Sequence, residues 1–217
     1  CGFCSVQSGR PLQADESEPY KVAKSINIMG VKHAVITSVD RDDLKDGGSI
    51  IWAKTVNAIR EINPKTTLET LIPDFKGDKE SINRIIDVAP EVVSHNLETV
   101  RRLTREVRIQ AKYDRSLEVL EYLKNNGVNR TKSGIMLGLG ETKNEVIDTL
   151  KDLRSVNVDI VTLGQYLQPT KNHLEVKEFI SPEQFKEYEV IGKNLGFRHV
   201  ESGPLVRSSY KAHKHIA

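Results

Sequence analysis

Cys1 and Cys4 stand three positions apart and are the only cysteines of the chain. Thiolates at this spacing bind a metal ion or an iron–sulfur cluster, but two ligands complete neither kind of site. A zinc site needs two further Cys or His ligands, and none of the six histidines lies at zinc-knuckle spacing beside another cysteine pair. The residues alone leave three functions open: half of a zinc site, a dithiol redox pair, or part of a cluster loop in which Phe3 shields the cluster from water.

A second group of reactive side chains follows the first predicted strand. It reads Thr37-Ser38-Val39-Asp40-Arg41-Asp42-Asp43-Leu44-Lys45-Asp46-Gly47-Gly48. Its four aspartates are able to bind a metal, an ammonium group or a ribose, although their spacing is not that of an EF-hand loop. The alternative is a solvated turn that caps the following helix.

Two further motifs carry little chemistry by themselves. Residues 138–142, Gly-Leu-Gly-Glu-Thr, lack a nucleotide-binding pattern, and Thr142 with Glu145 predicts a helix capping box instead. Residues 207–210, Arg-Ser-Ser-Tyr, match no generic catalytic motif, because a serine nucleophile elbow requires a strand, a sharp turn and a helix. On chemistry alone, this last stretch is expected to be an ordered tail.

Short apolar runs alternate with amphipathic stretches and predict the scaffold that must position these residues. The predicted strands are His33–Val39, Thr66–Ile72, Glu91–Ser94, Thr131–Leu137, Asp159–Leu163 and Phe197–Glu201. The predicted helices are Tyr20–Met29, Gly48–Ile62, Lys79–Asp87, Ser116–Asn125, Thr142–Val156 and Pro182–Leu195. This alternation indicates an α/β fold, with parallel strands and outer helices. Since a closed (β/α)8 barrel needs about 250 residues, we expect one domain over 1–217 with a partial barrel, and a doubly wound sheet is the alternative.

Polar side chains interrupt several predicted strands, whereas a buried parallel strand is usually almost continuously apolar. In the strand at 131–137, Lys132 is expected to point away from the helices. Thr37, Glu69 and Asn96 lie in or just after other strands. Polar groups that face the inside of a barrel predict a wet, functional interior, and the alternative is that some of them only cap helices.

The composition excludes several functional classes. The 32 basic residues nearly balance the 30 acidic ones, so the net charge of +2 argues against a nucleic-acid surface. A local basic stretch consists of Arg101, Arg102, Arg105, Arg108 and Lys112. It is interpreted as the solvated face of a helix, and the alternative is a site for an anionic partner. No apolar run is long enough to span a membrane. Two cysteines exclude a disulfide framework and favour a reducing compartment.

Taken together and in order, these segments closely resemble lipoyl synthases, a family of the radical S-adenosylmethionine superfamily. The matching segments are Cys1–Cys4, Thr37–Gly48, Leu71–Phe75, His95–Val100, Lys132–Glu141, Gly164–Pro169 and Val206–Tyr210. The Cys-Gly-Phe-Cys step is shared across the superfamily, whereas Arg207-Ser208-Ser209-Tyr210 is distinctive of the family.

The resemblance implies a partial (β/α)6-type radical SAM barrel and a sulfurtransferase activity. Cys1 and Cys4 resemble two thiolates of the CxxxCxxC loop for a 4Fe–4S cluster that binds S-adenosylmethionine. Ser209 resembles a ligand of a second, auxiliary 4Fe–4S cluster, which three N-terminal cysteines also hold and which donates sulfur. The implied reaction inserts sulfur at C6 and C8 of a protein-bound octanoyl group by means of a 5′-deoxyadenosyl radical.

The resemblance also implies roles for the polar residues and a set of partners. Residues expected to hold the cofactors are Thr37, Asp40, Glu69, Asn96, Lys132 and Arg207. No catalytic residue beyond the cluster ligands is expected. The implied partners are an octanoylated lipoyl-carrier domain or H protein and an electron donor such as ferredoxin or flavodoxin, with no nucleic acid and no membrane. The expected location is the bacterial cytoplasm, with an organelle as the alternative.

The sequence departs from the family pattern at its start and near its end. The first cysteine of the cluster loop, the three auxiliary cysteines and the first barrel strand are absent, and Lys211 replaces the usual histidine after Tyr210. We therefore expect a fragment of a longer enzyme that is inactive alone. The alternatives are a degenerate relative without catalysis, a non-catalytic zinc or iron–sulfur module, and another radical enzyme on the same barrel.

Overall fold

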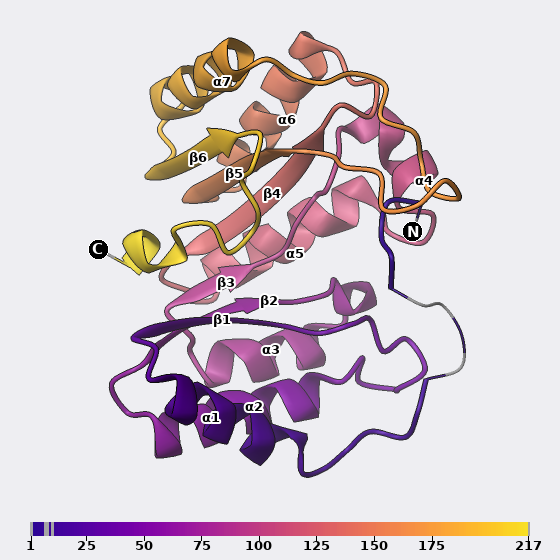
Figure 1. The fold of residues 1–217 in the computed structure, drawn as a ribbon. Helices are drawn as coiled ribbons and strands as arrows, with labels where there is room; N and C mark the ends of the chain where they lie inside the picture. The colour runs from indigo at the N-terminus through magenta and orange to yellow at the C-terminus, as the bar shows by residue number, and fades with distance from the viewer. Residues whose placement is uncertain (1, 7–8, 10, 217) are drawn as a thin grey trace.

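The computed structural model describes residues 2–6, 9 and 11–216. Its six strands form one parallel sheet in sequential order, as each helix carries the chain to the next strand position (Figure 1). The strands are β1 (His33–Thr37), β2 (Thr67–Leu71), β3 (Val92–Ser94), β4 (Thr131–Leu137), β5 (Ile160–Gln165) and β6 (His199–Gly203). The prediction of six parallel strands is confirmed.

The helices lie where the apolar spacing predicts them, with ends that move by up to three residues. They are α1 (Glu18–Met29), α2 (Ser49–Ile62), α3 (Lys79–Asp87), α4 (Thr104–Val107), α5 (Tyr113–Asn125), α6 (Lys143–Ser155) and α7 (Pro182–Asn194). Short 3-10 turns are η1 (Phe75–Gly77), η2 (Arg101–Leu103) and η3 (Ala212–Ile216). The four-residue α4 was not expected, because it is too short to show an amphipathic period.

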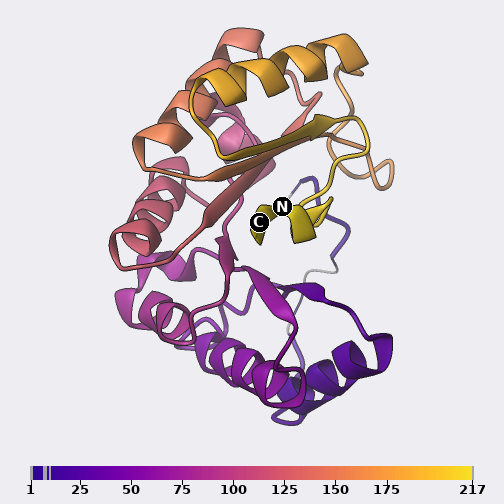
Figure 2. The same ribbon diagram turned by 90° about the vertical axis from the view of Figure 1, so that its left-hand side faces the viewer.

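The sheet curves into an open arc with the helices outside it (Figure 2). In the described part of the chain, β1 and β6 are its two edges, so the barrel is partial as expected. The strand order never reverses, which is inconsistent with the doubly wound alternative. Three clusters of buried apolar side chains fill the layer between sheet and helices, and Leu150, Leu163 and Phe185 belong to the largest of them. The other face of the sheet, inside the arc, carries the polar residues.

Some sequence motifs have structural roles. The Thr142 side chain accepts a hydrogen bond from the backbone N–H of Glu145, and the Glu145 carboxylate accepts one from Thr142, which confirms the capping box. Asp46 accepts bonds from the backbone N–H groups of Gly48 and Ile50 at the start of α2. The capping interpretation therefore accounts for Asp46 in the acidic loop. Among the described residues, no helix has the length and apolarity to cross a bilayer.

Candidate functional site

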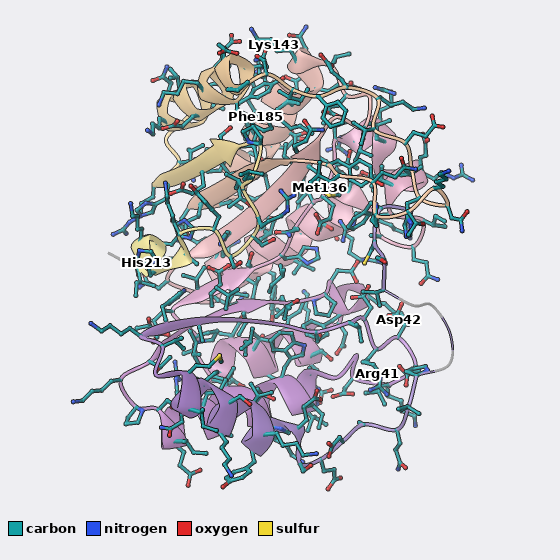
Figure 3. All side chains as sticks on the ribbon, in the orientation of Figure 1. Arg41, Asp42, Met136, Lys143, Phe185 and His213 are labelled. Carbon is teal, nitrogen blue, oxygen red and sulfur yellow. The ribbon has the colours of Figure 1, made fainter. Side chains whose placement is uncertain are left out.

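A cavity of about 180 Å³ opens inside the barrel where the strands end. Its walls come from segments that lie far apart in the sequence. The lining residues include Phe3, Asn96, Glu98, Gly134, Met136, Thr162, Leu167, Arg207 and Ser208. Met136 is labelled inside the arc in Figure 3, in contrast to Lys143 at the outer end of α6. We call Asn96, Glu98, Gly134, Thr162 and Ser208 the mouth cluster.

The segment after β3 positions two of the polar side chains of the mouth cluster, Asn96 and Glu98. Backbone hydrogen bonds continue from this segment to β4, from Glu98 N to Gly134 O at 2.9 Å and from Met136 N to Glu98 O at 2.8 Å. In this extended backbone, alternate side chains face opposite ways. Leu97 is buried in the apolar core, so Asn96 and Glu98 both line the cavity on the other face.

The backbone of Glu98 is strained. Its φ angle of 65° lies in the left-handed region, which residues other than glycine rarely adopt. Its carboxylate accepts one described hydrogen bond, from Asn96 Nδ2 at 3.1 Å. Burial raises the pKa of the Glu98 carboxyl, against the opposing influence of Arg108 and Asn96. A strained, partly desolvated carboxylate on a cavity wall is typical of a functional site.

The cavity passes a fit test for a polar organic ligand. Asn96 is 6% exposed, and its Oδ1 has no hydrogen-bond partner among the described residues. An unsatisfied buried acceptor is costly unless a ligand or water completes it. A Cβ atom at Gly134 would lie 2.6 Å from Thr162 Oγ1 and 3.1 Å from Asn96 Oδ1. Only glycine therefore fits here without displacing Thr162 or Asn96, and its bare backbone leaves room for a ligand to approach.

The cysteine segment reaches the same cavity through Phe3. The backbone of Gly2 is bonded to Val107 O and to Leu174 N, which fixes the segment at this end of the sheet. Cys1 lies outside the described residues. Cys4 is a free, partly exposed thiol, whose Sγ accepts a hydrogen bond from Val6 N at 3.4 Å. A free thiol that is partly exposed at this end of the sheet fits the role of a cluster ligand.

The Arg-Ser-Ser-Tyr segment crosses the inside of the barrel. A Cβ atom at Gly164 would lie 2.2 Å from Val206 O, so β5 admits the crossing only at a glycine. Ser208 Oγ accepts a hydrogen bond from Asn96 Nδ2 at 3.1 Å. Ser209, the predicted metal ligand, is exposed next to it. An exposed hydroxyl beside an anchored neighbour fits a ligand for an added metal group, although no three His, Cys, Asp or Glu residues in the described part converge on one point.

Glu69 and Lys132 form a second polar group deeper in the barrel. Lys132 Nζ lies 2.7 Å and 3.0 Å from the two carboxylate oxygens of Glu69, and both side chains are fully buried. It also donates to Ser208 O and lies 3.4 Å from His215 Nδ1. Burial lowers the pKa of the Lys132 ammonium, and the charge of Glu69 opposes this shift. We call Glu69, Lys132 and His215 the inner cluster.

The remaining predicted residues lie at the edge of the barrel. Thr37 ends β1 and Asp40 follows it in the acidic loop, and both are exposed. Figure 3 labels Arg41 and Asp42 of this loop on the side where the N-terminal segment passes. The structure therefore brings Asn96 and Arg207 to the cavity, pairs Glu69 with Lys132, and leaves Thr37 and Asp40 on the rim.

Sequence reasoning missed Glu98 and His215. Glu98 lies two positions after Asn96 in a segment that already matched the family, and this spacing in extended backbone was the available signal. His215 carries no local signal, because only the path of the tail buries it.

The basic stretch is largely paired within the chain. Arg101, on the 3-10 turn η2, contacts Asp114 and Asp152. Arg108 follows α4 and is partly buried, where it donates to Leu97 O, so the stretch is not the single solvated helix face that was expected.

Comparison with known proteins identifies the family. The model of the radical SAM superfamily matches residues 1–153. The lipoyl synthase of Flavobacterium johnsoniae is 74% identical over 216 residues, which covers 100% of this chain and 75% of that protein. The mitochondrial lipoyl synthase of Nematostella vectensis is also 74% identical, over 100% of this chain and 74% of its own length.

A solved structure agrees at the level of the fold. SuiB of Streptococcus suis, bound to its precursor peptide SuiA, superposes with a TM-score of 0.72 at 14% identity. The superposition covers 100% of this chain and 48% of SuiB. At such low identity the likeness concerns the arrangement of strands and helices alone. From the sequence relatives and the superfamily match together, the chain belongs to the lipoyl synthase family of radical SAM enzymes.

Proposed function

We propose that this protein inserts two sulfur atoms, at C6 and C8, into a protein-bound octanoyl group in lipoate biosynthesis. One observation of the structure supports this most strongly. Phe3 beside the cysteine motif, the Asn96–Glu98 segment and Ser208 of the family-specific tail all line one cavity. The segments that would hold two clusters and S-adenosylmethionine thus meet at one place in the fold.

The residues of the cavity suit S-adenosylmethionine and an alkyl chain. When bound, the cluster and S-adenosylmethionine supply the 5′-deoxyadenosyl radical that removes hydrogen from the octanoyl chain. Asn96 Oδ1, which has no described partner, is able to accept a hydrogen bond from an ammonium or hydroxyl group of S-adenosylmethionine. The Glu98 carboxylate is able to bind the same groups. Met136 and Leu167 give the cavity an apolar side for a hydrocarbon chain.

The predicted cofactor residues receive unequal support. Asn96 and Arg207 line the cavity, and Glu98 lies beside them, so we propose all three as residues that contact the cofactor. We propose that Thr37 and Asp40, at the rim, form the edge of the same ligand site on the side of β1.

We propose Cys1 and Cys4 as ligands of the cluster that binds S-adenosylmethionine and Ser209 as a ligand of the auxiliary cluster. The partly exposed thiol of Cys4 and the exposed position of Ser209 support two of these roles. A single radical SAM core that spans 1–217 and ends in the Arg-Ser-Ser-Tyr tail is part of the same proposal.

The partners follow from the family. Lipoyl synthases require a carrier that presents the substrate and a source of electrons. We propose an octanoylated lipoyl-carrier domain or H protein for the first and ferredoxin or flavodoxin for the second. Relatives occur both in bacteria and, by name, in mitochondria, and we propose the bacterial cytoplasm or an organelle as the location.

Anaerobic reconstitution tests the proposed function. The protein, expressed from its complete gene, is loaded with iron and sulfide and mixed with S-adenosylmethionine, dithionite and an octanoyl-lysine peptide. We expect lipoyl peptide together with 5′-deoxyadenosine and methionine. Formation of 5′-deoxyadenosine without sulfur insertion would assign the barrel to a different radical reaction. Zinc without iron in anaerobically purified protein would support the non-catalytic metal module.

A further inference from the structure

The buried ammonium of Lys132 obtains its partners from two separate parts of the chain. Glu69 on β2 supplies both carboxylate oxygens. The C-terminal tail supplies the Ser208 carbonyl oxygen and His215 Nδ1. In Figure 1 the end of this tail and the N-terminal segment lie toward opposite ends of the strands, and Figure 2 shows both inside the arc.

An ammonium group has three protons to donate, and three groups lie within hydrogen-bond distance of it: Glu69, the Ser208 carbonyl and, at 3.4 Å, His215 Nδ1. His215 Nδ1 accepts in the tautomer that carries the ring proton on Nε2. Two of these three acceptors belong to the tail. If the tail left the barrel, the Lys132 ammonium would keep only Glu69, and a fully buried ion pair would face water. The burial of the Lys132 charge therefore depends on the tail, and the tail in turn is held by that charge.

The two tail contacts flank the exposed Ser209. On one side, Ser208 is bonded through its carbonyl to Lys132 and through its hydroxyl to Asn96. On the other, Ala212 is 3% exposed and His215 fully buried. The hydroxyl of Ser209 thus stands on a short segment that is anchored at both ends, which restricts where it can lie.

We propose that the inner cluster is a latch that holds the C-terminal tail in the barrel and so positions Ser209. The inference rests on the proposed function, in which Ser209 is a metal ligand. In this account Glu69 and Lys132 are positioning residues for the tail, a role that differs from the contact with S-adenosylmethionine expected from the sequence. Their charged atoms point at each other and at the tail.

Hydrogen exchange of the tail tests the latch without relying on activity. His215→Phe keeps a ring in the buried space and leaves the Glu69–Lys132 pair intact, but it removes the acceptor. We expect amide exchange over residues 208–216 of the complete protein to become about tenfold faster. The matched control is His213→Phe, an exposed ring in the same turn that Figure 3 labels, and its exchange is expected to stay unchanged. Equal exchange in both variants would overturn the proposal.

A double variant separates the latch from the effect of a lone buried charge. Glu69→Leu with Lys132→Met removes both charges, so the sheet keeps an apolar filling while the tail loses its donor. We expect fast exchange over 208–216 and an affinity for S-adenosylmethionine within about threefold of the unsubstituted protein, which is less than the loss of a direct hydrogen bond to a charged group produces. A large loss of this affinity with unchanged tail exchange would instead support the direct contact.

Ser209→Ala makes failure of the proposed function distinguishable from failure of the latch. If Ser209 binds iron, this variant loses iron while its tail remains latched. If iron content is unchanged in Ser209→Ala but the tail of His215→Phe exchanges fast, the ligand role falls and the latch stands. If Ser209→Ala loses iron and His215→Phe has no effect, only the latch is wrong.

Discussion

Two groups of polar side chains share the inside of this barrel, and they differ in how their charges are satisfied. In the inner cluster, the Lys132 ammonium has three described acceptor groups. In the mouth cluster, the Glu98 carboxylate has one described donor, and Asn96 Oδ1 has no described partner. A buried polar group without a partner costs stability unless something completes it. In the inner cluster, only His215 Nε2 has no described partner, and both charged groups are satisfied. The comparison teaches that an inward-facing charged group marks a ligand site where its own hydrogen bonding is unfinished.

The largest difference is expected from removing one charge of the inner cluster. Lys132→Met leaves the Glu69 carboxylate fully buried without its counter-charge, which costs about 3–5 kcal/mol of unfolding free energy. Lys143→Met breaks an ion pair with Glu187 whose side chains are 48% and 44% exposed, and it is expected to cost about 0–1 kcal/mol. Urea unfolding measures both values. Similar costs would contradict the view that the inner pair is a coupled, buried element.

The close contact between the tail and β5 at Gly164 allows a second test, of whether the tail lies where the structure places it between the two clusters. At Gly164→Ala, the new methyl group would meet Val206 O at 2.2 Å, and we expect a loss of about 1–3 kcal/mol and a displaced tail. At Gly203→Ala, the nearest atom is Val206 Cγ2 at 3.5 Å, so the change is expected to stay within about 0.5 kcal/mol. Thermal unfolding and tail exchange are the measurements. If neither the unfolding temperature nor the amide exchange of the tail changed in Gly164→Ala, the tail would not cross β5 at this position.

The smallest effect concerns the pH dependence of the mouth cluster. The pKa of Glu98 is raised by burial above its ordinary value of 4.5, so the folded protein binds a proton that the unfolded chain has released. Stability from this group is therefore present at low pH and is lost as the pH rises through the folded pKa. Glu98→Gln removes this loss. In urea unfolding, we expect the variant to gain stability relative to the unsubstituted protein between pH 5 and pH 8. A loss over this interval would give the opposite sign and contradict the assignment.

Much of the scaffold could be predicted from the sequence, because alternation of apolar runs and amphipathic stretches is a local signal. The capping box at Thr142 could be predicted for the same reason. The partnership of Glu69 with Lys132 could not, since it depends on how strands β2 and β4 lie across the arc. His215 could be predicted still less, because its burial depends on a tail that folds back across the sheet.

The mouth cluster was predicted in part. Asn96 was expected to face the interior, and the structure brings it to the cavity with Arg207. Glu98 needed one further step, the continuation of the strand-like alternation beyond β3. The sequence pattern could not distinguish Lys132 from Asn96, because both are polar and point inward, and only their partners separate a latch from a ligand contact.

The central claim is that the tail brings Ser209 to a radical SAM site as a ligand for the sulfur-donating group. The most direct measurement is the ratio of lipoyl product to 5′-deoxyadenosine formed by the reconstituted Ser209→Ala variant, with Ser155→Ala at the exposed end of α6 as control. The account predicts continued formation of 5′-deoxyadenosine and a ratio lower by at least about tenfold, as expected for loss of a metal contact. An unchanged ratio in Ser209→Ala would contradict it.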